Sequence, residues 1–228
     1  GHGMPRRVAH DFIFNSWGRK YGPWDYDDVI PVAACRMTDT PCETHDFVLE
    51  GGSIDTDGQG TLLTTEQCLL NPNRNPSLTK GVIEERLRQW LGIRQIVWLG
   101  DGLEGDDTDG HVDDLTRFVA PGVVVTAVEK DRKDTNHAPL QDNLERLKKA
   151  KDSRGQPLRV LDMPMPPRSD GPHHRNPASH ANFYIANSAV LVPVFNSPTD
   201  QPTLDLLRPF FPDRKVVGID CSALVGGL

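Results

Sequence analysis

One histidine of this chain lies among five aspartates within nine residues. The segment runs from Asp106 to Asp114, with His111 near its centre and Asp113 two positions later. Side chains two positions apart on an extended segment point to the same face, so the imidazole and this carboxylate could share one pocket. A neighbouring carboxylate favours the imidazolium form and can orient the ring. The pair could act as a general acid and base on a cationic substrate, whereas a solvated acidic loop with a bystander histidine would explain the same local spacing.

The composition is that of a globular protein with an excess of acidic residues. The chain has 228 residues, with 25 Lys and Arg against 32 Asp and Glu, and a net charge of -7. This balance argues against nucleic acid as a partner and suits a small cationic ligand. No apolar run is long enough to span a bilayer and no signal peptide is visible, so we expect no membrane association and a cytoplasmic location. Gly1 to Gly3, before Met4, resemble a cloning remnant.

The cysteines predict neither a metal site nor a disulfide framework. The chain has Cys35, Cys42, Cys68 and Cys221, and no two of them form a CxxC pair. A zinc knuckle or a dithiol site is therefore not expected. Free thiols in a reducing compartment are the simplest interpretation. We predict no metal and no other cofactor.

Strand-like and helix-like segments recur in a fixed order. The pattern strand, strand, helix, strand occurs three times at a spacing of roughly sixty residues, and such self-similarity indicates a repeat architecture. The predicted strands and helices of the three units cover residues 47–99, 115–163 and 182–219. A strand at 12–14, a loop at 15–25 and a helix at 27–37 precede them.

Repeats of this kind can close into a ring, which removes exposed strand edges. Polar residues near the first strand of each unit would then converge on one central cavity. The contributors would be Glu50-Gly51-Gly52, Gly110-His111-Val112-Asp113 and Ser179-His180-Ala181-Asn182. The aromatic side chains of the 15–25 loop could stack on a guanidinium or ammonium group, or they could only fix the loop to the core.

Several segments together resemble the agmatine deiminase family, which groups agmatine deiminases with bacterial-type peptidylarginine deiminases. They are Phe14-Asn15-Ser16-Trp17-Gly18, Glu50-Gly51-Gly52-Ser53, Leu63 to Asn71, Asn73-Arg74-Asn75-Pro76, Thr108 to Asp113 and Asn182 to Asn187. The resemblance extends from about Phe12 to the last residue. It implies an α/β pentein fold, which is a propeller of five ββαβ blades. Residues 1–228 would form one incomplete catalytic domain of about three and a half blades.

The resemblance also implies a reaction. The family hydrolyses the guanidinium group of agmatine to N-carbamoylputrescine and ammonia, in putrescine and polyamine biosynthesis, through a covalent cysteine adduct. Carboxylates hold the guanidinium, and a histidine protonates the ammonia and then activates water. By resemblance, His111 is the acid and base, Asp113 binds the guanidinium and Glu50 pairs with the histidine. Asp107 would bind the distal amine and Trp17 would line the pocket. A homo-oligomer would be compatible with the family.

The chain departs from the family pattern at its two ends. The nucleophilic cysteine of the family lies in a Gly-Gly-x-x-His-Cys motif, and these residues end at Leu228, where that motif would begin. A further guanidinium-binding aspartate, in an Arg-Asp-x-Gly segment, would precede Phe12. Cys68 and Cys221 do not match the nucleophile position, so both are interpreted as structural. We therefore expect these 228 residues alone to be inactive.

Three alternatives remain open from the sequence. The substrate could be peptidylarginine or free arginine, although an amine-binding Asp107 would repel a substrate carboxylate. A metal-dependent hydrolase could use His111, Asp113, His173 and His174, but their spacing suits a compact site poorly. A non-catalytic fragment could bind only a cation or a partner chain.

Overall fold

The chain begins with two parallel strands joined by short helices. The computed structural model describes residues 7–171 and 174–225. Its first elements are β1 (Ala9–Ile13), α1 (Ser16–Arg19), α2 (Asp25–Asp28), α3 (Ile30–Met37) and β2 (Cys42–Val48). Strand β1 pairs in parallel with β2. The predicted loop at 15–25 contains the single turn α1, in which Trp17 and Gly18 have positive φ angles of 52° and 85°.

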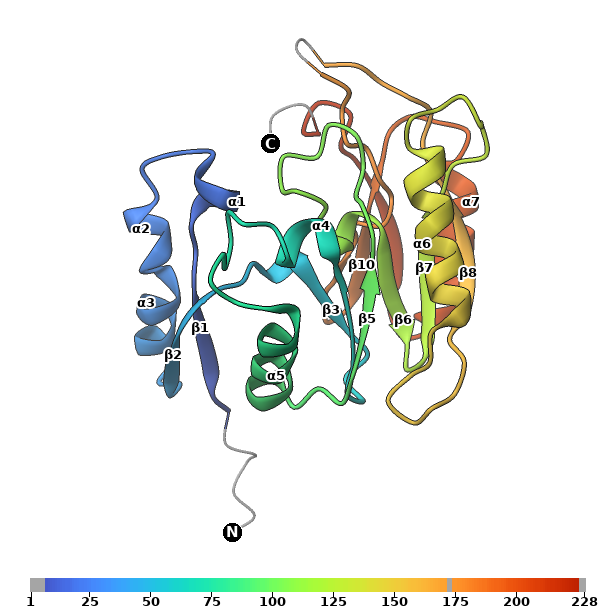
Figure 1. The fold of residues 1–228 in the computed structure, drawn as a ribbon. Coiled ribbons are helices and arrows are strands. Elements are labelled where there is room, and N and C mark those ends of the chain that lie inside the picture. The colour runs from blue at the N-terminus through green and yellow to red at the C-terminus, as the bar shows by residue number, and fades with distance from the viewer. Residues whose placement is uncertain (1–6, 172–173, 226–228) are drawn as a thin grey trace.

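Three ββαβ units follow, as predicted (Figure 1). The first has η1 (Gly51–Ser53), β3 (Ile54–Thr56), β4 (Thr61–Thr65), α4 (Glu66–Leu69), α5 (Lys80–Leu91) and β5 (Gln95–Leu99). The second has η2 (Val112–Asp114), β6 (Thr116–Ala120), β7 (Val123–Val128), α6 (His137–Lys149) and β8 (Arg159–Pro164). The third has β9 (Tyr184–Ile185), β10 (Ala189–Val194), α7 (Asp200–Leu207), η3 (Arg208–Phe210) and β11 (Lys215–Asp220). In each unit the middle strand is antiparallel to the first strand and parallel to the third.

One predicted boundary is wrong. The sequence pattern assigned the strand at 47–49 to the first ββαβ unit, whereas Phe47 and Val48 lie in β2, which pairs with β1 of the preceding segment. The 3-10 turn η1 separates β2 from β3, and β3 is the strand that forms the hairpin with β4. A turn of three residues can carry the chain from one sheet to the next without a long loop, and hydrophobic periodicity does not detect it.

The middle strands contribute to two hydrophobic cores at once, because neighbouring strand residues point to opposite faces. On β4, Leu62 packs with residues of β2 and α5, while Leu63 packs with residues of β7 and α6. On β7, Val124 belongs to that second cluster, and Val125 packs with residues of β10 and α7. Each of these three clusters therefore joins neighbouring strand groups, and Figure 1 shows blue β1 and β2 at one side, with red β10 behind β5 and β6.

The segments that precede β3, β6 and β9 come together, as predicted. The Oδ1 atom of Asp114 accepts a hydrogen bond from Nδ2 of Asn182 at 2.8 Å, and its main-chain oxygen accepts one from Ser179 Oγ at 2.6 Å. Gly52 lies directly beside His111 and Asp113. Three sequence-distant segments thus form one polar centre at the same end of neighbouring sheets.

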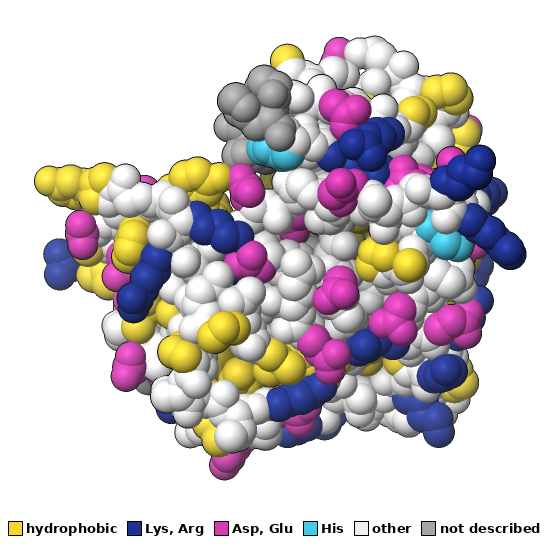
Figure 2. Space-filling model, turned by 45° about the horizontal axis from the view of Figure 1, so that its top comes forward, with side chains coloured by type: hydrophobic (Ala, Val, Ile, Leu, Met, Phe, Trp, Pro, Cys, Tyr) yellow, Lys and Arg dark blue, Asp and Glu magenta, His cyan; other side chains and the backbone are white. Residues whose placement is uncertain are grey.

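The surface carries mixed charge. Figure 2 shows acidic and basic side chains interspersed over one face of the described residues. Among the helices of residues 7–171 and 174–225, none combines the length and the apolar character that crossing a bilayer requires.

Candidate active site

A cavity of about 730 Å³ lies where these segments meet. Trp17 and Tyr21 from the α1 region form one part of its wall, and the loop at 105–114 forms another. Residues between Pro177 and Tyr184, together with the ends of β10 and β11, complete it. Its polar lining is Asp106, Asp107, Thr108, His111, Asp113, Asp114, Ser179, Asn182 and Cys221. Four of the five predicted site residues line this cavity, and Glu50 lies outside its wall.

The loop that carries His111 is fixed by its own side chains. The carboxylate of Asp106 accepts hydrogen bonds from the backbone N–H of Thr108 at 2.7 Å and of Gly110 at 2.8 Å. The hydroxyl of Thr108 accepts one from the backbone N–H of His111 at 3.1 Å. The side chain of His111 is 7% exposed. The interpretation as a solvated acidic loop is therefore wrong, because the loop is an ordered support for a buried imidazole.

Position 52 has no room for a side chain, because His111 and Asp113 occupy the space next to its Cα atom. A Cβ atom at this position would lie 2.5 Å from Nδ1 of His111 and 2.8 Å from Oδ2 of Asp113. Neither contact is sterically acceptable. Next to it, Gly51 has open space within 4 Å. The second glycine of Glu50-Gly51-Gly52 is thus required for the close approach of η1 to the site, whereas the first is not.

His111 lies between two carboxylates without a direct hydrogen bond to either. Its Nε2 atom is 4.0 Å from Oε2 of Glu50, and its Nδ1 atom is 4.0 Å from Oδ1 of Asp113. These separations exceed the hydrogen-bond range. His111 Nε2, Glu50 Oε2 and Asp113 Oδ1 are buried and have no hydrogen-bond partner among the described residues. Polar atoms left free in a buried region are uncommon, and they mark a place suited to a polar ligand.

Arg74 binds the carboxylate that the sequence pattern assigned to His111. Its Nε atom donates to Oε1 of Glu50 at 2.7 Å, its Nη1 atom to Oδ2 of Asp109 at 2.7 Å, and its Nη2 atom to the main-chain oxygen of Thr108 at 2.7 Å. Lys20 binds the other oxygen of Asp109 at 2.6 Å. Glu50 and His111 share no direct hydrogen bond: Arg74 binds Oε1 of Glu50, whereas Oε2 is free and lies 4.0 Å from Nε2 of His111.

Burial governs ionisation in this site. It lowers the pKa of His111 to about 4 against the opposite pull of Asp106, so the imidazole is neutral near pH 7. It raises the pKa of Asp113 to about 6 even though the cation of Arg117 is near. Burial and the neighbouring Asp113 carboxyl also raise the pKa of Asp114. The expectation that a nearby carboxylate favours imidazolium is wrong here, because desolvation outweighs it.

Asp107 is a further polar group of the cavity lining. The carboxylate of Asp107 accepts a short hydrogen bond from the hydroxyl of Tyr21, and its main-chain oxygen accepts one from Lys20 Nζ at 2.5 Å. The hydrogen bond to Asp107 raises the pKa of Tyr21. Trp17 packs edge-on against Tyr21 with ring centroids 6.0 Å apart. The cavity lining therefore combines the Asp107 carboxylate and the aromatic rings of Trp17 and Tyr21 with His111 and Asp113.

Comparison with known proteins identifies the family. The model of the Porphyromonas-type peptidyl-arginine deiminases matches residues 3–228. The chain belongs to this family. A crystal structure of an arginine deiminase homologue from Porphyromonas gingivalis matches with a TM-score of 0.92 and 39% identity, over 96% of this chain and 66% of that one. The agmatine deiminase of Enterococcus faecalis matches with a TM-score of 0.91 and 37% identity, over the same shares of the two chains.

These likenesses show that the fold of this deiminase-family chain is a pentein α/β propeller, as predicted. A curated sequence relative from Enterococcus faecalis is 38% identical over 250 residues, which covers 99% of this chain and 67% of the relative. The chain thus spans about two thirds of the length of the curated relatives that it matches.

Asn182 lies in a segment expected to reach the cavity, but its partner, like that of Arg74, was not predicted. Arg74 and Asn182 both lie in segments that carried the resemblance, but nothing in their local sequence shows which side chain each one contacts. Arg74 reaches Glu50 across 24 residues, and Asn182 reaches Asp114 across 68. Arg74 is buried, and Arg is buried almost only when it is paired, but this burial becomes visible only in the structure.

Two possible metal sets near the cavity fit poorly. His174 does not line the cavity that contains His111 and Asp113, and His173 lies outside the described residues. The ligand atoms of Glu50, Cys68 and His111 lie within 4.8 Å of one another. Burial, however, raises the pKa of the Cys68 thiol, and a thiol must lose its proton to bind a metal. Since Glu50 is also bound to Arg74, this set is a poor metal site.

Proposed function

We propose that the complete protein hydrolyses the guanidinium group of agmatine to N-carbamoylputrescine and ammonia. One observation carries the proposal. The described lining of the cavity includes four carboxylates, Asp106, Asp107, Asp113 and Asp114, and no lysine or arginine. Such a lining favours a cation over an anion, and a bound cation would also favour the ionised forms of Asp113 and Asp114, whose pKa values burial raises. Agmatine has a cationic group at each end of a short methylene chain, so it would match both the charge and the apolar walls.

The guanidinium would lie beside His111 and Asp113. Asp113 is costly to ionise in the free cavity, since burial raises its pKa, and a bound guanidinium would offset that cost by pairing with the carboxylate. His111 is neutral near pH 7, so it can accept a proton and return it to the departing ammonia. Glu50 would contribute to catalysis through Oε2, which has no hydrogen-bond partner among the described residues and lies 4.0 Å from Nε2 of His111.

The attacking group would be a cysteine thiolate, as in the family. We assign it to none of the four cysteines of this chain. Cys68 is fully buried, and burial raises its pKa. Cys221 lines the cavity, but burial and the nearby Asp220 raise its pKa as well. A thiol with a raised pKa is a poor nucleophile near neutral pH.

The distal amine of agmatine would bind Asp107, with Trp17 as part of the wall. Free arginine carries a carboxylate next to its amine, and the described lining offers that carboxylate no cationic partner. Solved agmatine deiminases from Enterococcus faecalis and C. jejuni, the latter with substrate bound, are similar to this chain at 37% and 35% identity. The role in putrescine formation, the cytoplasmic location and a homo-oligomeric assembly remain predictions.

The test is a substrate comparison with the complete protein, including any chain that flanks these residues. Agmatine, free arginine and an N-acyl arginine amide are incubated separately, and ammonia and the ureido product are measured. We expect kcat/KM to be highest for agmatine. A preference for the arginine amide would reassign the substrate to peptidylarginine, and the absence of ammonia from all three would refute the proposed reaction.

A further inference from the structure

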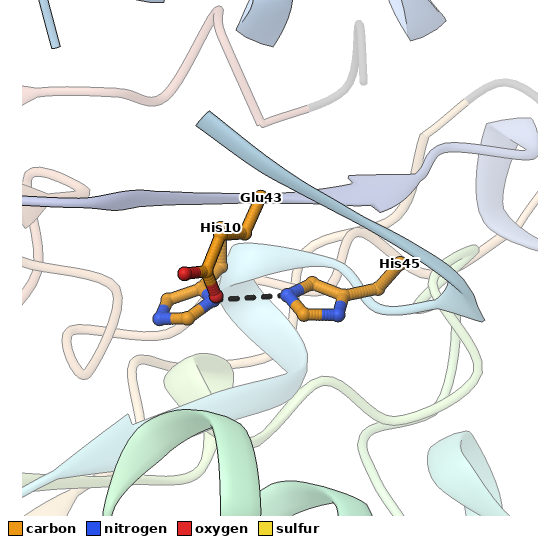
Figure 3. Close-up of side chains that lie close together, drawn as sticks. All are labelled: His10, Glu43 and His45. Atoms are coloured by element: carbon orange, nitrogen blue, oxygen red, sulfur yellow. Dashed lines mark hydrogen bonds and ion pairs between the residues drawn. The ribbon is translucent and has the colours of Figure 1, made fainter. Parts of the chain in front are cut away.

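A second cluster of ionisable side chains lies on the first strand pair, apart from the cavity. It consists of His10 on β1 and of Glu43 and His45 on β2 (Figure 3). None of the three lines the cavity that contains His111. The proposed deiminase reaction uses none of them.

The strand register brings the three side chains to one face. His10 is paired with Glu43, and Phe12 is paired with His45. Because side chains alternate along a strand, His10 and Phe12 share a face of β1, and Glu43 and His45 share the same face of β2. Nδ1 of His10 lies 2.9 Å from Nε2 of His45 and 3.7 Å from Oε2 of Glu43. Three potential ligand atoms thus lie within 4.8 Å of one another.

The inner imidazole is held in place by aromatic rings. The His45 ring lies 4.2 Å from the Trp90 ring of α5 and 4.9 Å from the Phe12 ring, measured between centroids. His45 is 9% exposed, whereas the Glu43 side chain is 62% exposed and the His10 side chain 20%. The cluster therefore has one fixed ligand at its base and an open side toward solvent, through which a hydrated ion can reach it.

We propose that His10, Glu43 and His45 bind a divalent transition-metal cation such as Zn²⁺. The ligands would be His10 Nδ1, His45 Nε2 and one carboxylate oxygen of Glu43, with water in a fourth position. Two imidazoles and one carboxylate are a common zinc ligand set with an open position. Two nitrogens about 2.1 Å from a tetrahedral zinc ion lie roughly 3.4 Å apart, so the two imidazoles need to separate by only about half an ångström.

The bound cation would cross-link β1 to β2. These strands are neighbours in space but are joined through more than twenty residues of short helices and turns, and closure of such a connection costs conformational entropy. A metal that binds only the folded strand pair would stabilise that pair by mass action. The competing interpretation is a hydrogen bond between the two imidazoles that requires no ion, and the two interpretations differ in their response to added zinc.

The experiment is a zinc titration of chelator-treated protein by calorimetry, with thermal unfolding measured in parallel. We expect one ion per chain, and a rise in Tm of roughly 5–10 °C at a zinc concentration about a hundred times the Kd. His10→Gln and Glu43→Gln should each weaken zinc binding by at least about tenfold to a hundredfold, since even the loss of a residue that only hydrogen-bonds to a metal ligand has that effect. Both replaced side chains reach the surface, so both variants should fold.

Matched controls separate the cluster from other zinc-binding groups. His137→Gln on α6 removes a comparably half-buried histidine, and Asp46→Asn removes an exposed carboxylate of the same strand β2. Cys68→Ala removes the thiol of the other candidate cluster. All three should bind zinc with unchanged affinity. Failure of the wild-type chain to bind zinc, or unchanged binding after His10→Gln and Glu43→Gln, would overturn the proposal without affecting the deiminase assignment.

Discussion

Oε2 of Glu50 lies 4.0 Å from Nε2 of His111, while Oε1 of the same carboxylate accepts a 2.7 Å hydrogen bond from Nε of Arg74. The buried guanidinium of Arg74 therefore compensates the charge of the Glu50 carboxylate, which weakens the effect of that charge on the His111 imidazole. This arrangement explains why Glu50 can remain behind His111 without forcing it into the charged form. Arg74 also binds Asp109, a half-buried carboxylate that Lys20 and Asn73 bind as well.

Arg74→Met should destabilise the fold strongly. The side chain of Arg74 is 0% exposed, and its removal leaves Glu50 buried without a counter-ion. The loss of one partner of a buried ion pair costs about 3–5 kcal/mol. Urea unfolding would measure the change in the free energy of unfolding. Arg88→Met is the matched control, because Arg88 makes an exposed pair with Glu84 worth less than about 1 kcal/mol. Equal losses in the two variants would contradict the assigned role of Arg74.

The double variant Glu50→Gln with Arg74→Met tests the cause of that loss. If the unpaired carboxylate is responsible, the neutral glutamine should recover part of the stability, since replacing both partners of a buried pair costs less than removing one. A double variant as unstable as the sum of the two single variants would indicate that packing, and not charge, determines the effect.

His111→Gln should abolish most of the turnover of the complete protein. Glutamine keeps a polar side chain of similar length but cannot exchange a proton, and general acid and base catalysis contributes about a hundredfold or more. The measurement is kcat for ammonia release from agmatine. His137→Gln, on the outer helix α6, should retain the wild-type kcat. If His111→Gln does too, another group performs the proton transfers.

Asp107→Asn should weaken agmatine selectively. The carboxylate lines the cavity and is held by the hydroxyl of Tyr21, so it can meet the distal amine of the substrate. A partly desolvated ion pair is worth more than the roughly 1 kcal/mol of an exposed one, which predicts a loss of about tenfold or more in kcat/KM. An alkylguanidine without the amine should lose much less. Equal losses for both substrates would show that Asp107 does not bind the amine.

The sequence allowed much of the fold to be predicted, because alternation and helical periodicity repeat in each unit. The exact start of the first unit could not be predicted. Phe47 and Val48 have the hydrophobic pattern of a strand in either position, and only the turn at 51–53 decides that they pair with β1. Sheet membership depends on tertiary pairing, which a local pattern does not contain.

The site was only partly predictable from spacing. His111 and Asp113 share a loop, so their spacing allowed a common pocket, but the local sequence left a solvated loop open and only the family resemblance favoured the site. The ionisation of His111 was predicted with the wrong sign, because desolvation depends on what the rest of the chain places around the ring. Arg74 was missed for the same reason: its partners Glu50 and Asp109 lie 24 and 35 residues away.

Asp113→Asn should stabilise the fold at neutral pH. The pKa of Asp113 is raised from 3.8 to about 6 in the folded chain, so the folded state binds the proton more tightly than the unfolded state. The free energy of unfolding of the wild type therefore falls as the pH rises from about 4 to 6. Asparagine removes this penalty. The variant should gain on the order of 1–3 kcal/mol above pH 6, and the gain should vanish below pH 4.

Two features make this measurement specific. The lowered pKa of His111 acts in the opposite direction, since its contribution is lost as the pH falls from 6.5 toward about 4. It should contribute to both the wild type and the variant, so the difference between them reports on Asp113 together with Asp114, whose pKa the Asp113 carboxyl raises. Asp152→Asn serves as a control of opposite sign, because hydrogen bonds from the Gln156 backbone lower the pKa of Asp152. That variant should lose stability at neutral pH, and a similar loss in Asp113→Asn would contradict the prediction.

Gly52→Ala and Gly51→Ala should have very different effects, although they are neighbours in the same turn. A methyl group at position 52 would lie 2.5 Å from Nδ1 of His111 and 2.8 Å from Oδ2 of Asp113, and so would displace both side chains. A misplacement of about 1 Å can cost a hundredfold in rate, so kcat/KM of the complete protein should fall by about that factor in Gly52→Ala. Position 51 has nothing within 4 Å of an added methyl group, so Gly51→Ala should retain nearly wild-type kcat/KM. Similar kcat/KM in the two variants would show that the His111 imidazole and the Asp113 carboxylate can move without loss of activity. Their observed positions would then not be the ones that catalysis requires.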